Sequence, residues 1–341
     1  MQHSFWYNST LLIASFFLIT SSTLKAEHNT TVDRAYNTVS TGILDLSEYL
    51  DKSISEWVTS EDTEKNIECV PEPIKINENQ NIDAFFQDNK YLNETEDTYI
   101  RLRIKNYLYS REDNKIKLKL NAQIPFNRCK KEWQLFLQDV QGSDSEIQSK
   151  DASNGGIGIR YFSEGIYGIK SNLSLGIRNS SPYVRARFRR PFTFDTWTIE
   201  PVQSFKYSSN EDLELETNIY FDKKIDDTKL FRIQLNRESR DEIEGINYGV
   251  SFEYYSTFSK NSGFGIRQSF FGNTHYNDFY EFDKDYNGIN NYVTSVTWRE
   301  NIWRKWFYYE VRPTVNFHKD YGYSPSYSLR LILDFYFGKY N

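Results

Sequence analysis

Basic residues recur at every second position in three stretches of the chain, and this spacing has the clearest chemical meaning. The residues concerned are Arg101, Arg103, Lys105, Lys115, Lys117, Lys119, Arg185, Arg187 and Arg189. Alternate side chains of a β-strand share one face, so each stretch predicts a ladder of positive charge. Later segments supply opposing charge at Glu214, Glu216, Glu253 and Glu310. Such ladders lining a water-filled pore favour the passage of anions.

These charges support two interpretations of a barrel lumen. In the first, the protein is a porin-like passive channel for small hydrophilic solutes, with a leaning towards anions. In the second, the charges pair across a narrow lumen and the barrel is a non-conducting structural or docking protein. An N-terminal helix then plugs the pore or binds a periplasmic partner. We predict the channel and keep the structural barrel as the alternative.

A third interpretation, a hydrolase that acts on lipids, rests on one histidine. His318 is close in sequence to Ser324 and Ser326, and a Ser–His pair needs a hydrogen bond between base and nucleophile. No orienting residue and no Gly-Xaa-Ser-Xaa-Gly context accompany it. The sequence also lacks the spacing of a zinc site, a calcium-binding hand or a phosphate loop. We therefore predict no enzymatic activity, no catalytic residue, no metal and no cofactor.

The elements that position these residues are short segments of alternating apolar and polar side chains, from Asp97 to the C-terminus. In one of them, Ile116 and Leu118 alternate with lysines, which gives one apolar and one basic face. A charge ladder facing hydrocarbon is costly, so the basic faces must point inward. The pattern predicts an all-β fold, a transmembrane antiparallel β-barrel with an aqueous interior.

Fourteen strands are predicted, and an even number suits a closed bacterial barrel. They begin near Thr98, Lys115, Lys131, Gly155, Gly165, Tyr183, Thr196, Glu211, Lys229, Gly245, Gly263, Asn291, Lys305 and Pro325. A barrel of twelve strands is the alternative if the segments at Tyr183 and Thr196 are not separate spans. The two longest connections, 141–154 and 273–290, follow odd-numbered strands, where extracellular loops are expected. These positions agree with an N-terminal segment that stays in the periplasm, which makes the odd-numbered connections extracellular.

Three regions are predicted along the chain: a signal peptide at 1–26, a periplasmic segment at 27–96 and the barrel at 97–341. Within the second region, apolar residues recur at three- and four-residue steps and predict an amphipathic helix. They are Val39, Ile43, Leu46, Leu50, Ile54 and Trp57. A charged linker, 59–80, and a short ambiguous segment, 82–91, follow the helix.

The two cysteines fall on the same predicted side of the membrane. Cys69 lies in the linker, and Cys129 lies in the second connection between strands. An even number of cysteines in an exported protein can pair in an oxidising compartment. We predict a disulfide that ties the N-terminal segment to the barrel rim, with two unpaired thiols as the alternative.

The composition agrees with an outer-membrane barrel. Tyr and Phe number 26 and 25 of the 341 residues, and aromatic rings favour membrane–water interfaces. The mean hydropathy of -0.69 suits a barrel because only every second strand residue faces lipid. A net charge of -6 argues against general nucleic-acid binding. The predicted partners are outer-membrane lipid, lipopolysaccharide and the barrel-insertion machinery.

Three stretches carry a resemblance to a known family. The run Trp298–Pro313 resembles the penultimate hairpin of an uncharacterised family of proteobacterial outer-membrane barrels, and Ser328–Phe335 and Asp97–Arg103 are similar to its last and first strands. The resemblance implies a Gram-negative outer-membrane location and transfers no catalytic residue. The last strand also resembles the C-terminal signal read by the insertion machinery, although four residues follow Phe337.

Overall fold

The computed structural model describes residues 31–58, 80–86, 99–126, 133–138, 156–178, 180–210, 212–241, 245–277, 285–302 and 304–338. The predicted signal peptide, most of the linker, and both Cys69 and Cys129 lie outside these residues. The disulfide therefore stays a prediction.

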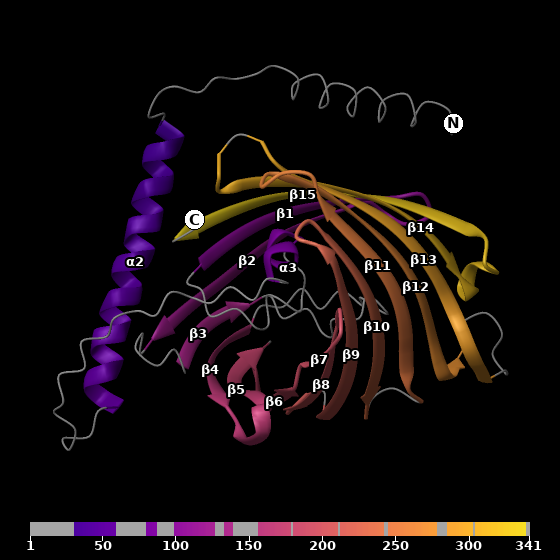
Figure 1. Cartoon of the computed structure of the whole chain (residues 1–341), viewed down its shortest axis with the longest axis horizontal. Helices are drawn as coiled ribbons and strands as arrows, with labels where there is room; N and C mark the ends of the chain where they lie inside the picture. The colour runs from indigo at the N-terminus through magenta and orange to yellow at the C-terminus, as the bar shows by residue number, and fades with distance from the viewer. Residues whose placement is uncertain are drawn as a thin grey trace.

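The described strands form one antiparallel sheet (Figure 1). Their bounds are β1 (Tyr99–Tyr109), β2 (Lys115–Phe126), β3 (Trp133–Gln138), β4 (Gly156–Glu164), β5 (Lys170–Arg178), β6 (Ser181–Arg189), β7 (Phe192–Phe194), β8 (Trp197–Ser208), β9 (Asp212–Asp226), β10 (Lys229–Arg240), β11 (Asn247–Thr257), β12 (Ser262–Asn277), β13 (Asp285–Asn301), β14 (Phe307–His318) and β15 (Pro325–Gly338). β6 and β7 are two parts of one span, because both pair with β8. Pro191 between them has no amide hydrogen for the ladder, so the strand is interrupted there.

The sheet closes on itself as a fourteen-strand barrel. β1 pairs with β15 from Tyr99 opposite Gly338 to Tyr109 opposite Ser328, and each other span pairs with its neighbours along the chain. A closed sheet satisfies its backbone hydrogen bonds internally, which is the condition for crossing a bilayer with strands. The fourteen-strand prediction is confirmed. The twelve-strand alternative is wrong, because the two doubtful segments form separate spans.

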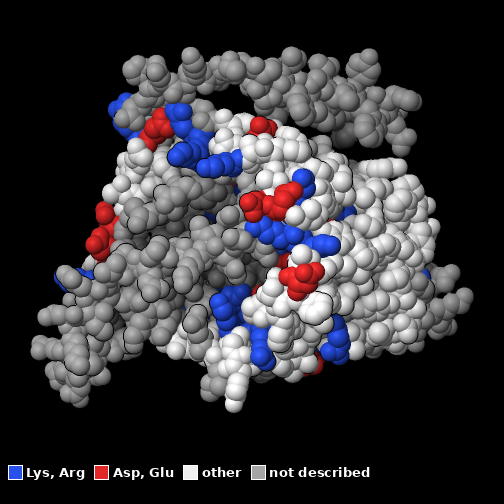
Figure 2. Space-filling view, viewed as in Figure 1, with Lys and Arg blue, Asp and Glu red and all other residues white. Residues whose placement is uncertain are grey.

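The two faces of the barrel wall differ in polarity. Ile116 and Leu118 on β2 are 75% and 70% exposed, whereas Arg101 on β1 is 2% exposed. Register places Ile104 opposite Leu118, on the face that β1 and β2 turn outward. Figure 2 shows a broad outer area over β11 to β14 with few charged residues. An apolar outside and a polar inside define an outer-membrane type of transmembrane barrel.

The fifth strand begins later than the sequence predicts. It starts at Lys170 rather than at Gly165, because the intervening residues form a short 3-10 turn, η2 (Ile166–Gly168). Tyr167 and Gly168 have φ angles of 63° and 73° there, and positive φ values interrupt an extended strand. Glycine adopts such angles without steric cost, and the adjoining tyrosine does so in a tight turn.

The hairpin of β12 and β13 is longer than the sequence predicts. β12 continues to Asn277, and β13 begins at Asp285 rather than at Asn291. The connection predicted at 273–290 is therefore shorter. A strand that leaves the hydrocarbon layer needs no apolar row, so alternation could not reveal these ends.

Two helices are described, α2 (Thr31–Val58) and α3 (Gln80–Phe86). α2 confirms the predicted N-terminal amphipathic helix and lies beside the ends of β1, β2 and β15, across their direction (Figure 1). α3 comes from the ambiguous segment and lies within the ring of strands. Neither of these described helices has the length and apolarity needed to cross a membrane.

Candidate functional site in the barrel lumen

Register places every predicted lumen residue on the inner face of the wall. The ladders of β1 and β2 face one another, with Arg103 opposite Lys119 and Lys105 opposite Lys117. The β6 ladder lies between inward-facing residues of β5 and β8. The four glutamates lie on the inner faces of β9, β11 and β14. The part that these residues play in conduction stays a prediction.

The inner faces of β1 to β6 form what we call the basic half of the wall. Along β1, β2, β5 and β6 as the structure describes them, no inward position by register holds Asp or Glu. The cations at those positions are Arg101, Arg103, Lys105, Lys115, Lys117, Lys119, Lys170, Arg178, Arg185, Arg187 and Arg189. Arg160 on β4 adds another, 4.7 Å from the centre of the Phe136 ring. This half therefore presents a positive potential to the lumen.

The inner faces of β8 to β15 form what we call the mixed half, where acids and bases pair. Nitrogen–oxygen contacts join Arg232 to Asp222 (2.6 Å), Arg267 to Glu253 (2.8 Å), Lys206 to Glu214 (3.2 Å) and Arg312 to Glu310 (2.9 Å). Glu253, Glu214 and Glu310 are buried. Pairing within one half offsets the charges locally, so this wall presents a weaker net field to the lumen.

Asp334 of β15 joins the two halves. Its carboxylate has no exposed surface and contacts three guanidinium groups, those of Arg101 at 3.0 Å, Arg103 at 2.6 Å and Arg299 at 2.7 Å. Arg299 also donates a hydrogen bond to the Tyr336 hydroxyl at 3.0 Å. Removing one member of such a group leaves buried charge uncompensated, so the group stabilises the closed barrel only as a unit.

Two polar contacts hold α3 inside the lumen against the mixed half. The Asp83 carboxylate lies 2.8 Å from Nη2 of Arg232. The backbone carbonyl of Phe85 accepts a hydrogen bond from Nε of Arg299 at 2.7 Å. The last carbonyls of a helix find no N–H donor within the helix, so a cationic donor there is favourable. Arg299 thus bonds both to the helix end and to Asp334.

Apolar packing completes the seat of α3. Ile82 and Phe86 pack against Leu230 of β10 and Tyr255 of β11, and all four are buried. The rings of Phe86 and Tyr255 have centroids 4.8 Å apart. Burying large aromatic side chains is a major favourable term, so the seat is a specific packing site.

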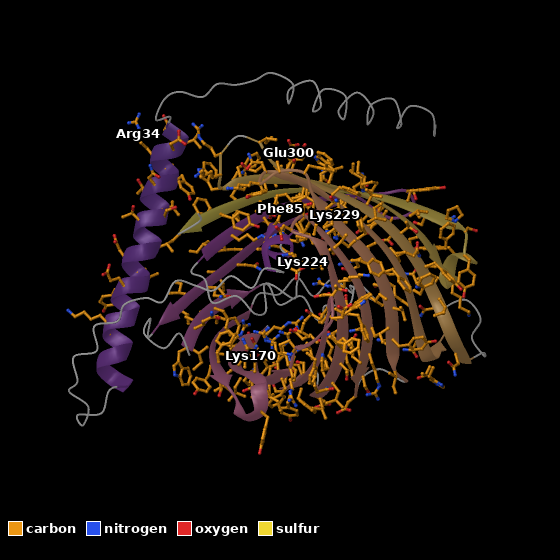
Figure 3. The ribbon with its side chains drawn as sticks, viewed as in Figure 1. Arg34, Phe85, Lys170, Lys224, Lys229 and Glu300 are labelled. Carbon is orange, nitrogen blue, oxygen red and sulfur yellow. The ribbon has the colours of Figure 1, made fainter. Side chains whose placement is uncertain are left out.

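Phe85 extends this seat towards β12 and β14. It lies inside the ring of strands in Figure 3, and its ring meets Tyr308 edge-on at 6.1 Å between centroids. A Cβ built on Gly263 of β12 would lie 2.9 Å from the Phe85 ring. The absence of a side chain at this position allows α3 to approach the wall.

A second group of cations and rings lies at the other end of β1. The stacked rings of Tyr107 and Tyr109 have centroids 5.9 Å apart. Lys117 and Arg330 lie 5.8 Å and 5.0 Å from the Tyr107 ring, and Lys115 lies 6.0 Å from the Tyr109 ring. Cation–π attraction of this kind aligns the cations along the wall.

Sequence reasoning missed the residues that hold α3 and close the barrel. Asp334 occupies an inward position of the last strand between the apolar Ile332 and Tyr336, which is a usable signal once the last strand is paired with the first. Arg299 and Arg232 occupy polar positions of predicted strands in the same way. The contact of Asp83 was not predictable from the sequence, because the pattern of a seven-residue helix is too short to show which side of the helix packs against the barrel.

The histidine of the hydrolase interpretation has a structural role. Nδ1 of His318 accepts a hydrogen bond from the Asp320 amide at 3.1 Å, at the start of a 3-10 helix, η3 (Lys319–Tyr321). This is a capping contact. Among the residues that the structure describes, no three His, Cys, Asp or Glu side chains are grouped to hold a metal ion.

No protein-family model and no curated protein matches the chain. Among solved structures, the chain is similar to the KdgM porin in complex with disordered oligogalacturonate, at 9% identity and a TM-score of 0.35, over 69% of this chain and 98% of that one. It is similar to OmpT of Vibrio cholerae at 8% identity and a TM-score of 0.44, over 71% and 97% of the two chains.

A third similar structure is OprD from Pseudomonas aeruginosa, at 8% identity and a TM-score of 0.39, over 70% of this chain and 92% of that one. At these identities and scores, the similarities carry no argument about solute or activity. The chain's own strand pairing, closed and antiparallel around a polar lumen, shows a porin-like barrel of the outer-membrane type.

Proposed function

We propose that this protein is a passive channel of the Gram-negative outer membrane that passes small hydrophilic solutes and favours anions. The observation that carries the proposal is the basic half, where the inward positions of β1, β2, β5 and β6, by register, hold only cations and neutral residues. A wall of one sign inside low-dielectric surroundings raises the local concentration of the opposite ion. The ends of the barrel near α2 and α3 face the periplasm.

In this proposal, α3 narrows the periplasmic end of the lumen. The contacts of Asp83 and Phe85 hold α3 to the mixed half, through Arg232 and Arg299. A solute that passes α3 then meets the basic half. The helix selects by size, and the cations of the basic half select by charge.

A closed structural barrel is the second candidate, and one observation favours it. Arg232 and Arg299 have no exposed surface, and Arg160 is 2% exposed, although all three face the lumen. Cations this deeply buried indicate a lumen largely filled by side chains and by α3. In that case α3 is a permanent plug, and the charges serve the fold alone.

Single-channel recording distinguishes the two candidates. The purified, refolded full chain is added to a planar lipid bilayer with a salt gradient across it. If the protein is a channel, we expect discrete openings and a reversal potential whose sign shows a preference for anions. A silent bilayer from a barrel whose folded state is verified by heat-modifiable migration contradicts the channel and favours the closed barrel.

Two charge reversals test the part played by the ladders. Lys117→Glu on β2 and Arg187→Glu on β6 each reverse one cation of the basic half, so the reversal potential should move towards cation preference. Lys229→Glu is the matched control, because this lysine is 43% exposed at the turn between β9 and β10. Openings with unaltered selectivity in both ladder variants would contradict the assignment of anion preference to the basic half.

A further inference from the structure

Two side chains of α2, those of Asp33 and Tyr36, fix the helix against the barrel rim. Both oxygens of the Asp33 carboxylate accept hydrogen bonds from Arg304, each at 2.7 Å, and this bonding raises the pKa of Arg304. Tyr36, one turn further on, stacks on Trp306 with centroids 4.6 Å apart and planes at 9°. The Tyr36 ring also stacks on Phe337 at 5.6 Å. These contacts set how the helix is rotated about its own axis.

The fixed rotation divides the apolar face of α2 into two strips. Ser40 and Ile43, on the Tyr36 side, are buried. The other strip stays uncovered along successive turns of the helix. Its large residues and their exposed fractions are Val32 (44%), Val39 (47%), Leu46 (48%) and Tyr49 (68%). Residues seven apart lie nearly in line on a helix, so these side chains form one continuous uncovered apolar strip.

Charged residues avoid this uncovered strip. Successive residues are 100° apart around the axis, and on that spacing Arg34, Glu48 and Lys52 lie on the other side of the helix from Val39 and Leu46. Asp45 lies beside Tyr49, at the edge of the strip. The smaller residues within the strip are Ala35 and Gly42. A helix that borders only water has no reason to separate its residues in this way.

The uncovered strip continues the lipid-facing surface of the barrel. α2 contacts β15 and β2. Leu118 and Leu120, on the outer face of β2, are 70% and 45% exposed, whereas Ile124 on the same face is 5% exposed where β2 nears its end. Figure 1 shows α2 running across the direction of β1 and β15, along the rim of the barrel.

We propose that α2 lies in the membrane–water interface at the strand-end rim, with the strip of Val32, Val39, Leu46 and Tyr49 in the boundary between headgroups and acyl chains. The occupant of the strip is the bilayer itself, because the strip is uncharged and adjoins the apolar band of the barrel. At 1.5 Å per residue, a helix of this length extends roughly 40 Å along the surface. Amphipathic helices with one apolar face bind membranes in this orientation.

A polarity-sensitive fluorescent amino acid at position 46 or 48 of the full-length barrel tests the orientation. Leu46 lies in the uncovered strip, and Glu48 lies on the charged face, so the second position is the matched control. In phosphatidylcholine vesicles, the emission maximum of the label at position 46 should be blue-shifted relative to that of the label at position 48. A nitroxide attached to a lipid acyl chain near the headgroup should quench the fluorescence at position 46 several-fold more than at position 48. Iodide in the aqueous phase should show the reverse order.

The other occupants give different results. If iodide quenches both positions equally, α2 lies in water and the proposal is wrong. If position 46 is shielded from both quenchers and its emission changes with the ratio of protein to lipid, a second copy covers the strip and the proposal is again wrong. Heat-modifiable migration verifies that each labelled barrel is folded.

A protease experiment tests the same proposal without a label. Val39→Asp combined with Leu46→Asp places charge in the strip, whereas Thr41→Asp places it on the exposed opposite side as a control. In vesicles, cleavage within α2 should become several-fold faster in the double variant and stay unchanged in the control. Equal cleavage rates in the two variants would overturn the proposal.

Discussion

The two halves of the barrel wall handle charge differently. In the mixed half, each of several buried acids has a basic partner on the same or the next strand, such as Asp222 with Arg232. In the basic half, cations are arranged in columns and acids are absent from the inward positions of four strands. Buried pairs rarely add net stability, but they fix which groups lie together. Cations of one column repel one another, and partners outside the column offset part of this cost, as Asp334 does for Arg101 and Arg103.

Under the proposed function, the mixed half holds α3 in place and the basic half contacts the solute. α3 binds to the mixed half through Asp83 and through the packing of Ile82 and Phe86. The ladders proposed to select anions lie on the other half. Asp334 connects the halves where the barrel closes, because it accepts from two arginines of β1 and one of β13.

The largest effect is expected from Asp334→Asn. This change leaves three guanidinium groups without their shared carboxylate, and breaking a buried ionic group typically costs about 3–5 kcal/mol. The free energy of unfolding, measured by denaturant titration in detergent or lipid, should fall accordingly. Asp226→Asn, at an exposed turn, is the control. A small loss in the Asp334 variant would show that the two halves are not joined through this residue.

The packing of α3 gives the next effect. Ile82→Ala removes apolar contacts worth roughly 2–5 kcal/mol, which favours release of α3 from its seat. Single-channel conductance should rise if α3 narrows the lumen, while the barrel stays folded. Val39→Ala, in the other helix, serves as the control. Unchanged conductance in an open channel would show that α3 does not limit the flow of ions.

A smaller effect is expected when an acid is removed from the mixed half. Glu216→Gln takes away one negative charge near the middle of β9, so the lumen becomes more positive. The reversal potential under a salt gradient should shift further towards anions, in the opposite sense to Arg187→Glu. A shift of the same sign in both variants would contradict the contrast between the halves.

The smallest effect is expected from Lys229→Gln. Its ammonium group lies 2.7 Å from the Asp226 carboxylate, with both side chains 43% exposed. Solvent screens such pairs, so neither the unfolding midpoint nor the ion selectivity should change measurably. A clear loss of stability would mean that the turn between β9 and β10 contributes more than its exposure indicates.

Much of the barrel was predictable, because alternation depends only on residues next to one another in one strand. All fourteen spans were found, and even the interrupted span at Pro191 was counted once. Two predicted strand starts were wrong, Gly165 for β5 and Asn291 for β13. At both places the alternation of apolar residues does not mark where the strand begins. At η2, a turn with positive φ angles replaced an expected strand start.

The candidate site was predictable only in part, for a related reason. Alternation identified the ladders of Arg185 and Lys117 as inward-facing. It gave no way to know that Asp334 would bond to Arg101, which is 233 residues away in the chain. It also left the position of the segment containing Asp83 undetermined.

The sequence by itself determined which residues of each strand face lipid and which face the lumen, because a charge ladder is tolerated on one side only. Only the tertiary structure decided which charges meet. Closure of β15 on β1 brings Asp334 to the first ladder, and the seat between β10 and β14 fixes α3 in the lumen. These contacts join residues far apart in the chain, and no local pattern of side chains encodes how the sheet closes.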